Sequence, residues 1–161
     1  MLYVVYILKS ISKNLKETSL LAKKFLAGIS KKHKTALLVL LSGNLGAGKT
    51  AFVKQVAKIL GVKEKIISPT FVLMRKYTLP PPLPRGGARR AEGSFRYLIH
   101  IDAYRLENKK ELVALNWDAI SRDPNNIIFL EWPERVFIRS PYGAKKITFK
   151  FIDEKTREIR F

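Results

Sequence analysis

One short segment has the residue types and the spacing that bind the phosphate groups of a nucleotide. It follows an apolar run and reads Gly43-Asn44-Leu45-Gly46-Ala47-Gly48-Lys49-Thr50, which fits the pattern Gly-x-x-x-x-Gly-Lys-Ser/Thr. Glycines let successive backbone N–H groups converge on one phosphate, and the lysine adds a full positive charge. The hydroxyl of Thr50 is a ligand suited to Mg²⁺. The segment therefore predicts a site for nucleotide phosphates and a metal ion.

Two acidic residues end apolar stretches that are typical of buried strands. Asp102 ends residues 95–102, and Glu131 ends residues 126–131, where it follows the uninterrupted apolar run 127–130. In a parallel sheet both lie at the edge where ligands bind, and a carboxylate there commonly helps to hold Mg²⁺. Glu131 is the stronger candidate for the metal. Asp102 then remains to orient the attacking water or to reach Mg²⁺ through water. The alternative is a structural role, in which Asp102 caps a turn or forms an ion pair, for instance with Arg105.

Three further positions have both a functional and a structural interpretation. Ser68-Pro69-Thr70 follows the second predicted helix, where many P-loop NTPases keep a segment that senses the γ-phosphate, but it is also an ordinary turn signal. Trp132 could stack near the nucleotide or against a partner, whereas a large aromatic side chain is more often part of the core. His100 lies inside a predicted strand, which favours a buried, hydrogen-bonded histidine over a proton shuttle.

The elements that position these residues alternate between strands and helices. Apolar periodicity predicts helices at 14–29, 50–60 and 107–121, the first with a capping-box-like Asn14-Leu15-Lys16-Glu17 and the second stopped by Gly61. Strands are predicted at 2–8, 36–42, 72–77, 95–102, 126–131, 145–152 and 156–161. This order favours an α/β fold of the P-loop NTPase type. We expect a mostly parallel central sheet flanked by helices, with an antiparallel C-terminal edge.

Length, composition and charge limit the classes of protein that fit. The 161 residues suit one domain, assigned to 1–161. Cysteine is absent, which removes disulfides, thiolate chemistry and common zinc sites and leaves the cytoplasm as the default location. No apolar stretch approaches the length that spans a bilayer. The net charge of +18 would attract polyanions such as RNA, although lysines spread along amphipathic helices also fit a solvated surface.

Four motifs in this order resemble the TsaE family, small bacterial P-loop ATPases formerly called YjeE. They are residues 43–50, Ser68-Pro69-Thr70-Phe71, His100-Ile101-Asp102-Ala103-Tyr104-Arg105-Leu106 and Glu131-Trp132-Pro133-Glu134. Together they span nearly the whole chain. The family is needed to make N6-threonylcarbamoyladenosine (t6A) in tRNA. The resemblance implies an ATPase that does not attach the modification itself but supports turnover of the TsaB-TsaD transferase assembly, with tRNA met indirectly or by weak contact.

The resemblance also implies roles for single residues. By motif, residues 43–49 cradle the phosphates of ATP, with Lys49 also serving in catalysis, and Thr50 and Glu131 hold Mg²⁺. We expect ATP hydrolysis by the isolated chain to be slow, because no catalytic arginine is fixed by a motif and the partners would have to complete the site.

Three more roles carry over from the family. Thr70 belongs to the switch segment, and Asp102 assists hydrolysis. The start of the first helix, here Glu17 and Thr18, lies near the nucleotide base. Two features depart from the family pattern: Asn44 stands where an acid is common, and residues 80–94 form a longer, basic, Pro/Gly-rich connector that we expect to be a flexible surface insertion.

Two other functions remain open from the residues alone. In a small-molecule P-loop kinase, the arginines of residues 80–94 would close over the phosphates as a lid, but no motif for a second substrate is evident. In a nucleotide-gated RNA-binding module, the positive charge would hold RNA directly. Transfer of phosphate to a metabolite, or tight RNA binding that responds to ATP, would identify the one or the other.

Overall fold

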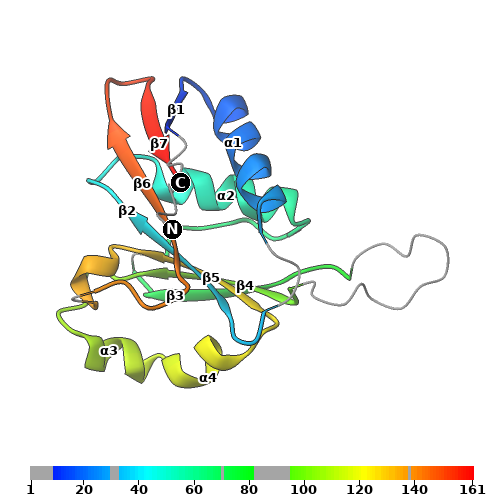
Figure 1. Ribbon diagram of the computed structural model, residues 1–161, viewed down its shortest axis with the longest axis vertical. Coiled ribbons are helices and arrows are strands. Elements are labelled where there is room, and N and C mark those ends of the chain that lie inside the picture. Colours follow the sequence, from blue (N-terminus) through cyan, green and yellow to red (C-terminus); the bar gives the residue numbers. More distant parts are fainter. Residues whose placement is uncertain (1–8, 30–32, 70, 82–94, 138) are drawn as a thin grey trace, which may run out of the picture.

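The fold is a single mixed sheet with helices on both faces, seen in a computed structural model that describes residues 9–29, 33–69, 71–81, 95–137 and 139–161 (Figure 1). Within these residues seven strands have the order β1-β7-β6-β2-β5-β4-β3. The strands are β1 (Lys9–Ser12), β2 (Leu37–Ser42), β3 (Met74–Thr78), β4 (Tyr97–Asp102), β5 (Asn126–Glu131), β6 (Lys145–Phe151) and β7 (Arg157–Arg160). The helices are α1 (Leu15–Ala27), α2 (Lys49–Ile59), α3 (Lys109–Ala114), α4 (Trp117–Arg122) and the 3-10 turn η1 (Pro133–Arg135).

The centre of the sheet is parallel and its margins are antiparallel. β6, β2, β5 and β4 run in one direction, so that their carboxyl ends meet at one edge. β3 is antiparallel to β4 at one margin, and β7 is antiparallel to β6 at the other. The predicted α/β class is therefore confirmed. The C-terminal hairpin is also antiparallel as expected, but β1 lies outside it and forms the outermost strand.

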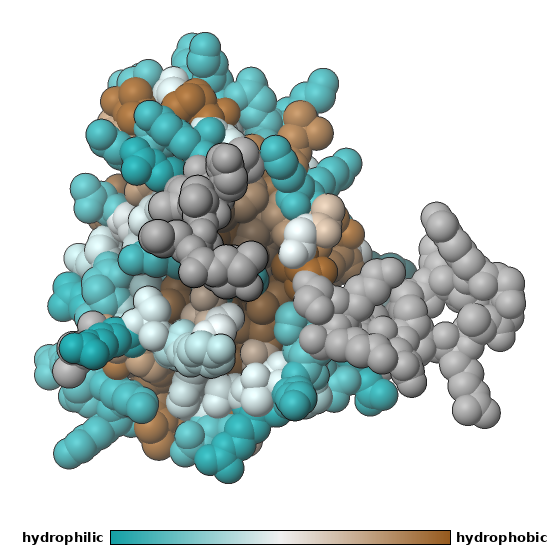
Figure 2. All heavy atoms as spheres, viewed as in Figure 1, coloured by the Kyte–Doolittle hydropathy of each residue, from teal (hydrophilic) through white to brown (hydrophobic). Residues whose placement is uncertain are grey.

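Alternation along the central strands supplies a core on each face of the sheet. In β5, Ile127 and Phe129 pack with the helices α1 and α2, whereas Ile128 and Leu130 pack with α3 and α4. Figure 1 shows these two helix pairs on opposite sides of the sheet. Strands covered on both faces must be apolar at nearly every position, which explains the continuous runs in the sequence. In the same view, Figure 2 shows hydrophilic side chains gathered around the periphery.

Helix α1 begins at the predicted cap. The backbone N–H of Glu17 donates to Oδ1 of Asn14 (2.9 Å), and Oε2 of Glu17 accepts from the N–H of Lys13 (2.7 Å). This reciprocal arrangement satisfies two N–H groups that have no partner inside the helix. It fixes the point at which the chain turns from β1 into α1.

Helix α2 ends at the predicted glycine. Gly61 has φ +83°, and the N–H groups of Gly61 and Val62 donate back to the carbonyls of Lys58 and Ala57. These are the two hydrogen bonds of a Schellman motif, which requires a left-handed residue after the helix. A Cβ at Gly61 would also meet the ring of Pro80 at 2.8 Å. Glycine is needed here for conformation and for space.

The predicted helix over 107–121 was wrong in one respect, because the structure divides it. Asn116 is left-handed (φ +61°) and separates α3 from α4. Leu112 and Trp117 are both buried against the sheet, yet residues five apart lie about 140° apart around a continuous helix. The turn at Asn116, a residue type that tolerates this conformation, brings both side chains into the core.

The remaining predictions on elements fall at the borders of the described residues. β3 begins at Met74 rather than at residue 72, because Val72 and Leu73 form a turn in which both N–H groups donate to Pro69. The strand predicted at 2–8 and most of the connector at 80–94 lie outside the described residues. Among the helices described, none has the length and apolar content to cross a membrane.

Candidate functional site

The predicted phosphate loop lies between β2 and α2, at the carboxyl edge of the sheet. Gly43, Gly46 and Gly48 have φ values of +146°, +74° and +100°. At Gly43 the loop passes so close to the backbone of Phe149 in β6 that a Cβ could not fit. The chain therefore curls at this point as the sequence pattern requires, and the first turn of α2 opens toward the loop.

Lys49 reaches back across this loop from the start of α2. Its Nζ donates to the carbonyl oxygens of Gly43 (2.5 Å) and Asn44 (3.0 Å). The side chain is buried, and burial lowers the pKa of Lys49 below its usual range, although the negative charges of Glu131, Asp102 and Glu134 act in the opposite direction. The ammonium is thus held in a poorly solvated position that favours contact with an anion.

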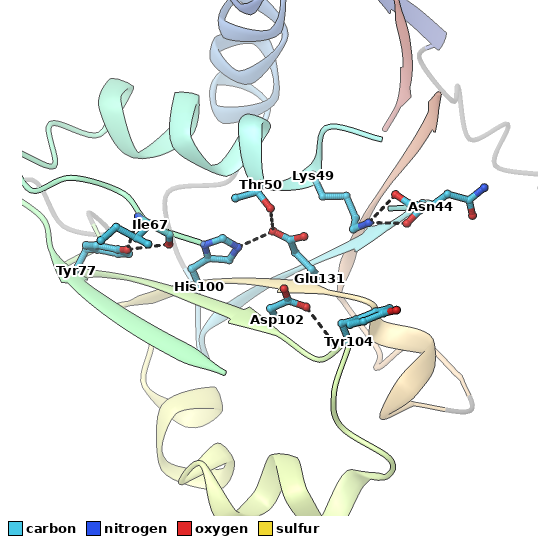
Figure 3. A network of polar contacts seen from close by, with 10 residues as sticks. Asn44, Lys49, Thr50, Ile67, Tyr77, His100, Asp102, Tyr104 and Glu131 are labelled. Atoms are coloured by element: carbon cyan, nitrogen blue, oxygen red, sulfur yellow. Dashed lines mark hydrogen bonds and ion pairs between the residues drawn. The ribbon is translucent and has the colours of Figure 1, made fainter. Parts of the chain in front are cut away.

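The two predicted acids meet at the ends of neighbouring strands. Asp102 in β4 and Glu131 in β5 are register partners, and both are buried. Oε1 of Glu131 accepts a hydrogen bond from Oγ1 of Thr50 at 2.7 Å, which joins the end of β5 to the start of α2 (Figure 3). Oδ1 of Asp102 accepts from the backbone N–H of Tyr104 (3.0 Å). The hydroxyl and both carboxylates therefore converge beside the phosphate loop.

These groups line a pocket of about 290 Å³. Its walls include the loop residues 45–51, the side of Ser68, both acids and two aromatic residues, Tyr104 and Trp132. The rings of Tyr104 and Trp132 lie 5.1 Å apart, and Nζ of Lys49 stands 4.1 Å from the centroid of Trp132. Trp132 thus lines the pocket and also packs against the core on the α3 and α4 side of the sheet, so that a role beside the nucleotide stays a prediction.

A second pocket, of about 370 Å³, lies on the other side of the same loop. Gly46, Ala47, Gly48 and Ala51 border both pockets. Beyond them the second pocket is lined by the start of α1 and by the turn between β6 and β7. The loop therefore separates these two pockets, which we together call the two-part groove.

Thr18 stands in this second pocket, where the family resemblance places the base. Its Oγ1 is 2.8 Å from Oγ of Ser12 and 3.2 Å from the carbonyl oxygen of Asn14. Asn14 lines the pocket with it. The capped beginning of α1 thus forms one wall, and the pocket lies across the loop from Lys49 and Glu131.

Arg157 contributes to the same wall and was missed from sequence. Its Nε donates to the carbonyl oxygen of Gly46 at 3.2 Å, and NH1 donates to the carbonyls of Asp153 and Thr156. Because it comes from β7, more than a hundred residues after the loop, no local motif marks it. Only pairing of the C-terminal hairpin with the sheet brings it to the phosphate loop.

The donor set next to Lys49 fits Mg²⁺ rather than a metal that prefers nitrogen or sulfur. No cluster of three or more His, Cys, Asp or Glu side chains suited to a metal ion occurs in the described ranges. Thr50 and Glu131 would supply two oxygen ligands, and nucleotide phosphates and water would supply the rest. Mg²⁺ is commonly held in this way, with few protein ligands.

Two further residues named from the sequence, Arg105 and Asn44, do not contribute a side-chain contact to the site as the structure describes it, and a third, Thr70, lies outside the described residues. The guanidinium of Arg105 lies over the ring of Phe71, 4.7 Å from its centroid. Asn44 and Leu45 are exposed at the tip of the loop, so the amide of Asn44 stands where the family commonly has a carboxylate. The backbone carbonyl of Asn44, rather than its side chain, makes the contact with Lys49.

Comparisons with known proteins point to one family. A family model described as "Threonylcarbamoyl adenosine biosynthesis protein TsaE" matches residues 12–159. A protein of Nostoc sp. named "tRNA threonylcarbamoyladenosine biosynthesis protein TsaE" is 40% identical over 125 residues, which are 75% of this chain and 67% of that protein. A protein of the same name from Rickettsia bellii is 31% identical over 143 residues, 88% of this chain and 85% of its own.

A solved structure gives the same result for the fold. The crystal structure of YdiB from Bacillus subtilis superimposes with a TM-score of 0.63 and 26% sequence identity. The superposition covers 99% of this chain and 87% of YdiB. The overall fold described above is therefore similar to that of an experimentally determined protein.

Proposed function

The chain belongs to the TsaE family of t6A biosynthesis proteins, and we propose that it binds and hydrolyses ATP with Mg²⁺ to support turnover of the TsaB-TsaD assembly. One observation carries the proposal: Thr50 and Glu131, which are far apart in sequence, are joined by a 2.7 Å hydrogen bond beside the phosphate loop. A hydroxyl and a carboxylate at this place are the protein ligands that a nucleotide-bound Mg²⁺ requires.

The two-part groove accommodates the two parts of ATP. The base and ribose would occupy the pocket between Thr18 and Arg157, and the phosphates would cross the loop toward Lys49. Thr50 and Glu131 would hold the Mg²⁺ ion, whose positive charge would offset the negative charge of the phosphates. Lys49 would exchange its contacts with loop carbonyls for phosphate oxygens, and the rings of Trp132 and Tyr104 would restrict water on the far side.

In this proposal Asp102 acts on the water that attacks the γ-phosphate. It is buried, it is the register partner of Glu131, and it lines the same pocket as Lys49. A carboxylate here can accept a hydrogen bond from water and orient it in line with the bond that breaks. Because no known motif in the sequence supplies a catalytic arginine, we expect the isolated chain to hydrolyse ATP slowly and the TsaB-TsaD pair to accelerate it.

The test is ATP hydrolysis by the purified chain, measured with and without the TsaB-TsaD pair. Lys49→Ala is expected to abolish nucleotide binding or hydrolysis, and Glu131→Ala to reduce chiefly the Mg²⁺-dependent rate. Lys54→Ala is the matched control, because Lys54 is exposed on the same helix and lines neither part of the groove. Unchanged rates in both site variants would overturn the assignment of the site.

The same reactions separate the proposed ATPase from a kinase. Phosphate released into water is the expected product. Phosphate recovered instead on a small metabolite, in amounts equal to the ADP formed, would make the chain a kinase. A change of the rate on adding TsaB-TsaD would then no longer support the proposed ATPase function.

A further inference from the structure

His100 is a fully buried polar residue on the second strand from one margin of the sheet. It lies on β4, and its Nε2 is 2.8 Å from Oε1 of Glu131 on the neighbouring strand (Figure 3). Leu98, two residues earlier on the same strand face, is part of the apolar core beneath α1 and α2. A histidine at such a position loses its contacts with water, so its polar atoms need a partner.

The hydrogen-bond partner of His100 is a carboxylate oxygen of Glu131 that also accepts a hydrogen bond from Thr50. Oε1 of Glu131 accepts from Oγ1 of Thr50 and faces Nε2 of His100, so that groups from α2 and from β4 hold one carboxylate oxygen from two sides. Two donors on one oxygen fix the rotation of the carboxylate. Oε2 is then the oxygen that can turn toward a metal ion or toward a water bound to it.

The hydrogen on the imidazole can be placed from its surroundings. Nδ1 of His100 is buried and has no hydrogen-bond partner among the residues that the structure describes. A hydrogen on Nδ1 would therefore be a buried donor without an acceptor, which is unfavourable, whereas a hydrogen on Nε2 points at a carboxylate. The ring is best described with its hydrogen on Nε2, which makes His100 a donor to Glu131.

From these contacts we propose that His100 is a positioning residue for the metal site, acting through Glu131. The inference rests on the function proposed above. Carboxylates that bind metals are themselves commonly held by hydrogen bonds, and loss of such a partner typically weakens metal binding by about 10- to 100-fold. His100 does not touch the nucleotide in this assignment. Its effect is to keep Glu131 in the orientation that Mg²⁺ needs.

Two variants separate positioning from packing. In His100→Gln the amide nitrogen falls near the place of Nε2 and can still donate to Glu131, whereas His100→Leu fills similar space without a donor. We would measure Mn²⁺ binding to each protein in the presence of ADP by electron paramagnetic resonance, with thermal unfolding as the check on folding. We expect the Leu variant to bind Mn²⁺ about 10- to 100-fold more weakly, and the Gln variant to lose much less.

A measurement on the unaltered protein covers the case in which a variant fails to fold. Nitrogen-15 NMR of the imidazole is expected to show a hydrogen on Nε2 and none on Nδ1, with a change at Nε2 when Mg²⁺ and ADP are added. The opposite tautomer, or equal Mn²⁺ affinities in the Leu variant and the unaltered chain, would overturn the positioning role. Absence of Mn²⁺–ADP binding in the unaltered chain would instead contradict the proposed function itself.

Discussion

Lys49 is a buried, positively charged residue at the proposed phosphate site. Its ammonium lies under the ring of Trp132 and against two backbone carbonyls, and burial lowers its pKa. These carbonyls carry only partial charges, whereas the phosphates of a nucleotide carry full ones. The residue is thus arranged to gain more from a bound anion than from its present contacts.

We predict that nucleotide binding takes up protons at alkaline pH. In the free protein burial holds the pKa of Lys49 below its usual range, so a larger part of the population is neutral at alkaline pH. Bound phosphates favour the charged form and raise the pKa, so binding must add a proton, and affinity for ADP falls as pH rises through this window. Calorimetry of ADP binding at alkaline pH, in buffers with different ionisation enthalpies, measures the uptake. Proton release would contradict the assignment.

The residues of the site differ in how far sequence could predict them. The phosphate loop is consecutive, so its pattern sufficed, and Asp102 and Glu131 followed from the rule that ligands lie at strand carboxyl ends. Trp132 stayed undecided because an aromatic residue after a strand can face either way. His100 was interpreted as an ordinary buried histidine because its partner, Glu131, belongs to another strand, and only the register between β4 and β5 reveals the pair.

At the scale of elements, the ends of the helices fix the walls of the groove. α1 starts at a capped turn that carries Thr18 into the groove, and α2 starts at Lys49 and ends at Gly61. Both ends could be predicted, because caps and stops use particular residue types within a few positions. The break at Asn116 could not, since it depends on which side chains the sheet buries rather than on local pattern.

Gly61 offers a test of the α2 terminus with a matched control. Gly61→Ala forces a left-handed alanine and brings Cβ against Pro80, so we expect a loss of at least about 1–2 kcal/mol in the free energy of unfolding. Gly28 follows α1 with φ −84°, and a Cβ there would make only ordinary contacts. Gly28→Ala should be neutral or stabilising by about 0.4–1 kcal/mol. Denaturant unfolding of both variants checks this, and equal effects would contradict it.

At the scale of the whole molecule, the chain is strongly basic. It has 31 lysines and arginines against 13 acidic residues, a difference of +18. Hydrophilic side chains cover the periphery seen in Figure 2. Such a field accelerates encounters with polyanions but carries no information on sequence. The charge therefore supports weak contact with tRNA and does not by itself make RNA the ligand.

We predict that the isolated chain binds tRNA weakly, with a dissociation constant on the order of 10⁻⁴–10⁻⁶ M at physiological salt. The logarithm of affinity should fall linearly with the logarithm of salt concentration, because binding releases counterions. A duplex DNA of similar length is the control and should bind comparably. Titration of the protein with tRNA, with and without ATP, distinguishes the two candidate functions. Tight binding to tRNA that changes with ATP would favour the RNA-binding module over the ATPase.

The placement of β1 has a consequence for the way the protein is made. β1 leads directly into the capped start of α1, yet its partner in the sheet is β7, which also brings Arg157 to the loop of residues 43–50. During translation β1 must therefore wait for β7 to emerge from the ribosome. A nascent chain that has already formed this loop would still lack Arg157, so under the proposed function full affinity for nucleotide would arise only after β7 has been made.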